Sequence, residues 1–252
     1  MLSFFMNFSY SYILLLFCLS CTGKSDLIFN MRDEQETNIG FINKLDYNEQ
    51  LNAYTYRNFY NGAGVAIGDI NNDGLADIYV SGNLVDNKLY LNQGNLKFQD
   101  ITEQAGVACK AVWSTGVTMA DVNGDGWLDI YVCKSGMPSN TDDRRNQLFI
   151  NNQDLSFSDK SLEYNLDDNG LSVHAIFFDM DNDQDLDMYL LNNSGRSIGG
   201  YDLRLGQRMV RDSLDNNKLY RNDGNEFIDV SAISEIFTSA IGYGLGVTAS
   251  DL

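Results

Sequence analysis

The sequence is poor in several residue types, and each shortage narrows the possible folds. It has one proline, one histidine, and only 7 glutamates against 28 aspartates. Glutamate favours helices, whereas aspartate favours turns, caps and calcium sites, so this ratio argues against a solvated helical surface. We find no periodicity of 3.5 or 3.6 residues, which argues against a coiled coil or a helical solenoid. The 22 glycines and the single proline instead predict tight turns between short strands.

Basic residues and catalytic motifs are also scarce. Lysine and arginine number 17 against 35 acidic residues, giving a net charge of −18. This charge argues against nucleic acid and anionic membrane surfaces as partners. The sequence contains no nucleophile elbow, metalloprotease motif or phosphate loop. The single histidine, His174, aligns with glycines of a repeat described below, so we interpret it as a substitution on a strand rather than as a catalytic base.

No apolar run reaches the roughly 20 residues that span a bilayer. The run "YILLLFCLS" (12–20) is shorter and predicts a signal peptide over residues 1–20, although no lysine or arginine precedes it. The stretch "LSCTGKSD" (19–26) resembles a bacterial lipoprotein cleavage site and predicts lipidation of Cys21; the alternative is an ordinary secreted protein. Residues 21–55 are interpreted as an N-terminal segment or linker.

Beyond Cys21, the cysteines are Cys109 and Cys133. Two cysteines form no framework pattern, although an exported protein could bridge them. Cys133 follows "DIYV", so we favour a small buried strand residue over a disulfide and leave the bridge open.

An internal repeat determines the predicted fold. The segment "GVAIGDINNDGLADIYV" (64–80) recurs as "GVTMADVNGDGWLDIYV" (116–132) and as "HAIFFDMDNDQDLDMYL" (174–190), and a fourth copy begins at "GVTASDL" (246–252). A second element recurs in phase, as "NKLYLN" (87–92), "NQLFIN" (146–151) and "NKLYRN" (217–222), each followed by Phe-x-Asp. Each unit therefore reads as strand, acidic loop, strand, loop, strand, turn, strand.

Four short strands in a unit of 50 or more residues are typical of a propeller blade. We predict an all-β, partial β-propeller of three four-stranded blades plus the first strand of a fourth, spanning residues 56–252. The recurring aromatic residues of the third strand, Tyr90, Phe149 and Tyr220, are expected in the core. Such an incomplete ring would leave blade faces and strand edges uncovered.

The D-x-N-x-D-G-x-x-D loops resemble FG-GAP/VCBS-type repeats, which build integrin-like propellers. The flanking stretches "FYNGAGVAIGDINNDGLADIYVSGN" and "NKLYLNQGNLKFQDITEQAGV" are similar to bacterial exported proteins of the ASPIC/UnbV, cartilage-acidic-protein-like group. The resemblance covers roughly residues 56–252. It implies an exported protein of the cell envelope, either an outer-membrane lipoprotein or a secreted one, with more repeats and a C-terminal domain in its longer members.

The acidic loops have the donors that calcium prefers, which are six to eight oxygens. Side chains at positions 1, 3, 5 and 9, with the carbonyl of position 7, can converge on one ion. The predicted ligands are Asp69, Asn71, Asp73, Leu75 and Asp77 in the first loop; Asp121, Asn123, Asp125, Trp127 and Asp129 in the second; and Asp179, Asp181, Asp183, Asp185 and Asp187 in the third. An EF-hand is excluded because position 12 is Val80, Val132 or Leu190 instead of glutamate. The alternative is an Asx-rich turn without metal.

Position 6 of the loop is expected to need a positive φ angle. It is Gly74 in the first copy and Gly126 in the second, but Gln184 in the third. The cost of a non-glycine residue there is about 1–2 kcal/mol. We therefore expect the third loop to bind a metal less readily than the first two, although the additional carboxylate of Asp181 could offset the strain.

The connection between the second and third strands grows from one copy to the next. It takes 10, 17 and then 30 residues from position 9 to the following asparagine. The longest carries four arginines in an otherwise acidic protein, and loops that vary on a constant scaffold commonly carry recognition. The predicted partner-binding residues are Arg196, Arg204, Arg208 and Arg211. A solvated loop without a partner is the alternative.

These features predict a non-catalytic, calcium-binding module of the cell surface that binds a protein or a glycan. Its membrane contact would be limited to the N-terminal lipid. The rival interpretation is a scaffold segment of a larger propeller-containing enzyme, such as a polysaccharide lyase or hydrolase, with its chemistry outside this sequence. A purely architectural segment of an envelope protein is a third.

Overall fold

The computed structural model describes residues 29–136, 141–195, 211, 214–224, 226–236 and 242–250. The predicted signal peptide, Cys21, Arg196, Arg204 and Arg208 lie outside these residues. The chain divides into two compact units, Met1–Asp33 and Glu34–Leu252. Within the described part, no helix is both long and apolar enough to cross a bilayer.

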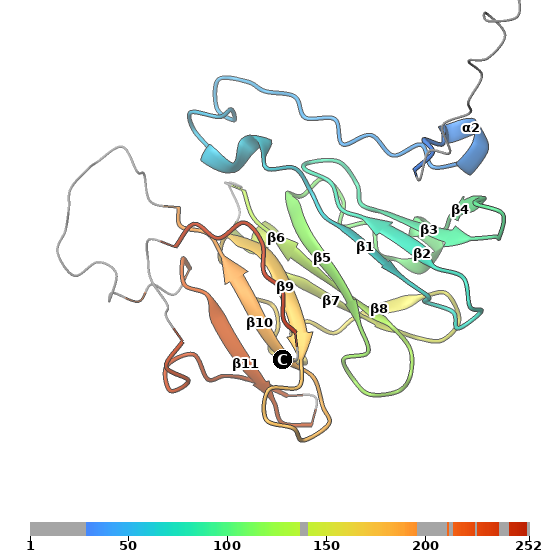
Figure 1. Cartoon of the computed structure of the whole chain (residues 1–252). Helices are drawn as coiled ribbons and strands as arrows, with labels where there is room; N and C mark the ends of the chain where they lie inside the picture. The colour runs from blue at the N-terminus through green and yellow to red at the C-terminus, as the bar shows by residue number, and fades with distance from the viewer. Residues whose placement is uncertain are drawn as a thin grey trace, which may run out of the picture. The chain divides into compact units, whose positions relative to one another are not determined.

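The second unit contains three antiparallel four-stranded sheets, each with its strands in sequence order (Figure 1). The first sheet consists of β1 (Val65–Gly68), β2 (Asp77–Val80), β3 (Lys88–Asn92) and β4 (Phe98–Asp100). The second consists of β5 (Ser114–Ala120), β6 (Asp129–Lys134), β7 (Gln147–Asn151) and β8 (Phe157–Asp159). The third consists of β9 (Ser172–Phe178), β10 (Asp187–Asn192), β11 (Lys218–Asn222) and β12 (Phe227–Asp229).

The helices among the described residues are single turns: α2 (Glu34–Thr37), η1 (Arg57–Tyr60), α3 (Thr102–Ala105) and η2 (Thr141–Arg144). The fold is therefore all-β, and its three sheets correspond to the three predicted blades. They do not close into a ring. Just before the fourth copy, Tyr243 forms an isolated bridge with Asn193, and residues 246–250 of that copy form no strand.

The first strands of the three blades, β1, β5 and β9, lie side by side (Figure 1). Glycine at the start of a repeat makes this close approach possible. A Cβ atom added to Gly64 would lie 2.6 Å from the carbonyl oxygen of Thr115, and one added to Gly116 would meet the backbone of Val173. His174 occupies the same position in the third blade, at the outer end of this series.

Two apolar cores lie between neighbouring blades. The first contains Tyr79, Leu89 and Val107 from the first blade, and the second contains Tyr131, Cys133 and Leu148 from the second. Each core is completed by equivalent residues of the following blade, namely Val117, Ile130, Val132, Phe149 and Phe157, and then Ala175, Met188, Leu190, Tyr220 and Phe227. The recurring aromatic residues are buried as predicted, with exposures of 3–5%.

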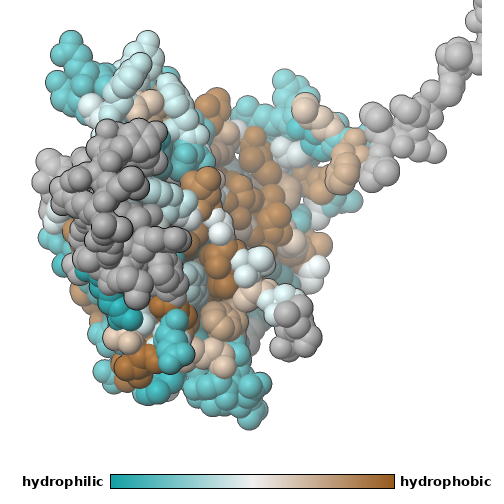
Figure 2. Space-filling view, turned by 60° about the vertical axis from the view of Figure 1, so that its left-hand side comes forward, coloured by the Kyte–Doolittle hydropathy of each residue, from teal (hydrophilic) through white to brown (hydrophobic). Residues whose placement is uncertain are grey.

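The corresponding face of the first blade has no blade packed against it. Its inner residues Val65 and Ile67 are 61% and 66% exposed. Its outer residues Val80, Tyr90 and Phe98 are buried against Ile39 and Phe41 of the N-terminal segment. Apolar surface also gathers in the middle of the face shown in Figure 2.

The remainder of the N-terminal segment packs near the connections between second and third strands. Leu45 and Leu51 contact a cluster of Tyr56, Phe59 and Trp113, and Asn43 exchanges two hydrogen bonds with Asn83. The predicted division of the chain at residue 56 stays a prediction.

Candidate metal centres in the acidic loops

The acidic loops follow β1, β5 and β9 and lead into the second strand of each blade. The carboxylate at position 1 organises each loop. Asp69 accepts hydrogen bonds from the N–H groups of Asp73 (3.1 Å) and Gly74 (2.7 Å). Asp121 accepts the equivalent pair from Asp125 and Gly126, at 3.0 and 2.8 Å. The aspartate at position 1 of the loop therefore holds the backbone curled around its own carboxylate.

The aspartate at position 9 is buried and joins the loop to the third strand. Asp129 accepts one hydrogen bond from the N–H of Val122 in the loop and one from Asn151 at the end of β7, both at 2.9 Å. Asp77 and Asp187 make the same pair of contacts in their blades. Burial raises the pKa of Asp129 to about 6, and the charges of the other loop aspartates add to the rise.

Positions 3 and 5 distinguish the third loop from the first two. The side-chain amide of Asn71 donates to Asp73 at 3.0 Å, and Asn123 donates to Asp125 at 3.1 Å. The third loop has a carboxylate, Asp181, in place of this amide. Burial and then the charge of Asp183 raise the pKa of Asp181, because neighbouring carboxylates destabilise one another's charged forms.

The third loop also gathers carboxylates most closely. Asp179, Asp181 and Asp187 each offer an oxygen, and these oxygens lie within 4.8 Å of one another. No other group of three or more metal-binding His, Cys, Asp or Glu side chains occurs among the described residues. Asp185 adds a buried Oδ1 without a hydrogen-bond partner, and burial raises the pKa of this carboxyl to about 6. Sequence reasoning assigned only the carbonyl of Asp185 to the site.

The backbone at position 6 has the expected positive φ angle in all three loops. The angles are 85° at Gly74, 86° at Gly126 and 78° at Gln184. Position 4 is also left-handed, with φ angles of 57° at Asn72 and 63° at Asn182, which the sequence analysis missed. The recurring asparagine or glycine at that position was the available signal.

The first two acidic loops lie in a segment that matches a known repeat family. A family model described as an FG-GAP-like repeat matches residues 69–132. The chain contains an FG-GAP-like repeat. It is also 30% identical over 163 residues to cartilage acidic protein 1 of Xenopus tropicalis, and 39% identical over 69 residues to cartilage acidic protein 1 of Mus musculus. The matched parts cover 63% and 27% of this chain, and 23% and 11% of those proteins. The predicted resemblance to FG-GAP and cartilage-acidic-protein-like sequences is confirmed, and the chain spans less than a quarter of either relative.

Hydrogen bonds of the first FG-GAP loop connect the first blade to the second at the end where the acidic loops lie. The amide of Asn72 donates to the carbonyl of Gly126 at 3.1 Å, from the first loop to the second. Asn151, on the second blade, donates to the carbonyl of Ile70 in the first loop at 2.8 Å. A change in the conformation of one loop can therefore reach the next blade.

A corner at the end of each FG-GAP blade was missed in the sequence. The aspartate of Phe-x-Asp accepts hydrogen bonds from the N–H and hydroxyl of a residue two positions later. Asp100 pairs with Thr102, Asp159 with Ser161, and Asp229 with Ser231. The Thr102 hydroxyl in turn accepts from the N–H of Leu89 at 2.9 Å. The extended pattern Phe-x-Asp-x-Ser/Thr was present in the sequence.

The remaining candidate residues lie away from the acidic loops. Arg211 donates to the carbonyls of Ser231 and Ala232, at 3.1 and 3.4 Å. This predicted partner-binding arginine therefore also attaches its insertion to the third blade. Cys109 and Cys133 are both free thiols, and burial raises the pKa of Cys109 to about 11, which suppresses thiolate reactivity.

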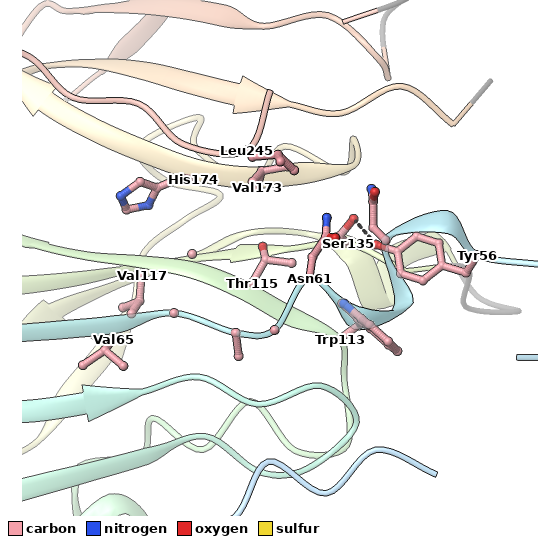
Figure 3. Close-up of a pocket in the computed structure, with 15 residues that line it drawn as sticks. Tyr56, Asn61, Val65, Trp113, Thr115, Val117, Ser135, Val173, His174 and Leu245 are labelled. Atoms are coloured by element: carbon pink, nitrogen blue, oxygen red, sulfur yellow. Dashed lines mark hydrogen bonds between the residues drawn. The ribbon is translucent and has the colours of Figure 1, made fainter. Parts of the chain in front are cut away.

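His174 lines a cavity of about 340 Å³ beside Thr115, Val173 and Leu245 (Figure 3). Its Nδ1 atom is buried and has no hydrogen-bond partner among the described residues. Burial lowers the pKa of this imidazole. At the far side of the cavity, the Tyr56 hydroxyl and Ser135 form a 3.0 Å hydrogen bond.

Proposed function

We propose that this protein is an exported, non-catalytic binding module whose blades are stabilised by calcium and which recognises a protein or glycan at the cell surface. The observation that carries the proposal is the repetition of one oxygen-rich loop in three packed blades. The FG-GAP-like match and the similarity to cartilage acidic proteins support it. Lipidation of Cys21 in a bacterial envelope is part of the same proposal.

The donor chemistry of the loops fits calcium. All side-chain donors are carboxylate or amide oxygens, which a hard cation prefers over nitrogen or sulfur. The third loop brings three carboxylates together and leaves the Oδ1 of Asp185 buried without a hydrogen bond. An ion held by the side chains at positions 1, 3, 5 and 9 would offset the repulsion between neighbouring carboxylates. This repulsion contributes to the raised pKa of Asp181 and of Asp185, which lies two residues before Asp187. Its chemistry would be electrostatic, since it would fix loops rather than activate a substrate.

Thermal melting in calcium and in chelator tests this assignment. Extracellular calcium modules bind with Kd of about 10⁻⁴–10⁻³ M. Calcium at about ten times Kd would add about 1.4 kcal/mol per site, or about 4 kcal/mol for three independent sites. For a protein of this size, that gain should raise Tm by roughly 8–16 °C.

Two variants sharpen the calcium experiment. Asp179→Ala removes the position-1 carboxylate of the third loop and should reduce the calcium-dependent rise in Tm by about one third, since one of three equal sites is lost. Glu163→Gln removes a surface carboxylate that pairs with Lys160 outside the loops and should keep the full rise. Melting curves that coincide in calcium and chelator would remove calcium from the proposal.

We further infer that the arginine-rich insertion contacts the partner. Its four arginines oppose a net charge of −18, and its length departs furthest from the repeat. Replacing Arg204 and Arg208 with serine should weaken binding to a glycan array by about tenfold, because each loses a charge-assisted contact. The same protein should keep its calcium-dependent Tm. Unchanged array binding of this variant, with loss of binding on Asp69→Ala, would instead place the partner at the acidic loops.

A further inference from the structure

Lys134 departs from the repeat at a position whose structural hydrogen bond does not depend on the side chain. In every blade, the residue five positions after the position-9 aspartate donates its N–H to the side chain of the asparagine just before the third strand. Gly82 donates to Asn87 at 2.8 Å, Lys134 to Asn146 at 2.7 Å, and Asn192 to Asn217 at 3.0 Å. These hydrogen bonds identify Lys134 as the counterpart of a glycine and an asparagine. Because neither of these residues carries a charge, the shared hydrogen bond does not require a lysine at this position.

Lys134 is buried as a residue, and no partner of its ammonium group lies in the part of the chain that the structure describes. The residue is only 6% exposed, and among the residues that the structure describes its Nζ forms neither a hydrogen bond nor an ion pair. Other lysines of this acidic chain are paired with carboxylates, as in Lys88–Asp100, Lys110–Glu103, Lys160–Glu163 and Lys218–Asp168. A buried charge without a counter-ion costs free energy, and that cost disappears when an anion binds beside it.

The side chain lines a pocket of about 310 Å³ between the first two blades. One wall is α3 and the connection after it, with Thr102, Cys109 and Lys110, and the other is formed by β6 and β7, with Lys134 and Gln147. Lys110 supplies a second ammonium group, which the exposed Glu103 neutralises in part. Burial lowers the pKa of Lys134, so the pocket disfavours the charged ammonium form, and the nearby carboxylates Asp159 and Asp143 oppose that shift only in part.

We propose that this interblade pocket binds a small oxyanion through the ammonium group of Lys134, with Lys110 at its rim. The ligand class is a carboxylate, sulfate or phosphate group, either free or carried on a larger molecule. The pocket shares no lining residue with the acidic loops or with the arginine-rich insertion. The anion site can therefore be tested independently of the proposed calcium sites.

Titration of isotope-labelled protein in calcium, followed by amide chemical shifts, tests the site. The probes are sulfate and acetate, added at constant ionic strength against chloride. We expect saturable shifts at Cys109, Lys134 and Gln147 for at least one probe. Lys134→Met should weaken binding by about tenfold or more, because it removes the charge and keeps the volume. Lys134→Arg should retain it, and Lys88→Met, which removes a lysine paired with Asp100, should bind as the wild type.

The melting temperature of Lys134→Met distinguishes a lysine that serves a ligand site from one that the scaffold requires. If Lys134 serves a ligand, Lys134→Met should melt in chloride at the same temperature as the wild type or higher, because a buried unpaired charge is lost. Two results would overturn the proposal: no saturable shift with either anion, or equal affinity in the wild type and Lys134→Met. A Lys134→Met protein that melts well below the wild type would assign the lysine to the scaffold.

Discussion

At position 6 of each acidic loop, the backbone adopts a conformation that most side chains disfavour. Gly74 and Gly126 accommodate it without a Cβ atom, whereas Gln184 holds a φ angle of 78° with one. The left-handed conformation costs an L-residue about 1–2 kcal/mol. The third loop therefore stores strain that the first two avoid, in the same loop that gathers three carboxylates.

Replacing this glutamine should release the strain. Gln184→Gly should stabilise the protein by about 0.5–1 kcal/mol, since part of the conformational gain is lost to the greater entropy of glycine in the unfolded chain. Urea unfolding in chelator measures the change without a contribution from calcium. The matched reverse substitution, Gly126→Gln, should destabilise by about 1–2 kcal/mol. Equal stability of all three proteins would show that the left-handed angle is not strained.

The identity of the loop residues could be predicted from sequence, but the different hydrogen-bonding roles of the position-1 and position-9 aspartates could not. Spacing alone marks Asp121 and Asp129 as equivalent oxygen donors, because both recur in every copy. Only the fold shows that Asp129 is buried and joins its loop to the end of β7, whereas Asp121 is half-buried and accepts hydrogen bonds from N–H groups within its own loop. A carboxylate that joins a loop to the third strand and one that curls its own loop are both written as aspartate in the sequence, so spacing alone cannot distinguish them.

The N-terminal segment acts at the scale of whole elements. Ile39 and Phe41 pack on Val80, Tyr90 and Phe98, which are the outer part of the face that the other blades bury against a neighbour. A short stretch of irregular chain thus covers part of a surface that a four-stranded sheet covers elsewhere. Val65 and Ile67 on the same blade stay exposed.

Removing one of these covering side chains should weaken the segment's attachment. Phe41→Ser should destabilise the protein by about 1–2 kcal/mol, roughly half the cost of truncating a fully buried phenylalanine. It should also increase the binding of a hydrophobic dye, because Val80 and Tyr90 become accessible. Ile42→Ser is the matched control, since Ile42 is adjacent in sequence and 76% exposed, and it should change neither quantity. Equal effects of both substitutions would contradict the packing described here.

This segment also shows where prediction from the repeat ends. Strands β1 to β12 follow from three in-phase copies, because each copy repeats its apolar alternation and its turn residues. Residues 34–63 have no counterpart in the other copies, so no comparison within the chain could place them. The alternation of Ile39 with Phe41 indicates one apolar side, but it does not identify the surface that this side covers.

At the scale of the molecule, the three blades share one pattern of contacts and differ at their boundaries. The interblade cores were predictable, since the same apolar positions recur and each sheet needs cover on two faces. The features outside that pattern are the covered face of the first blade, the unpaired Lys134 and the cavity beside His174. The first depends on residues without a counterpart in the other copies, and the other two depend on a residue that differs between copies. An alignment of the copies predicts none of the three.

The chain has two tryptophans, and the fold places them in contrasting surroundings. Trp113 is 4% exposed and packs edge-on against Tyr56, with ring centroids 5.0 Å apart, beneath the N-terminal segment. Trp127 is half-buried at position 7 of the second acidic loop, next to carboxylates. Intrinsic fluorescence is thus divided between a shielded, blue-shifted emitter and one open to collisional quenchers. The protein carries two optical reporters, one for the seating of its N-terminal segment and one for the state of a single loop.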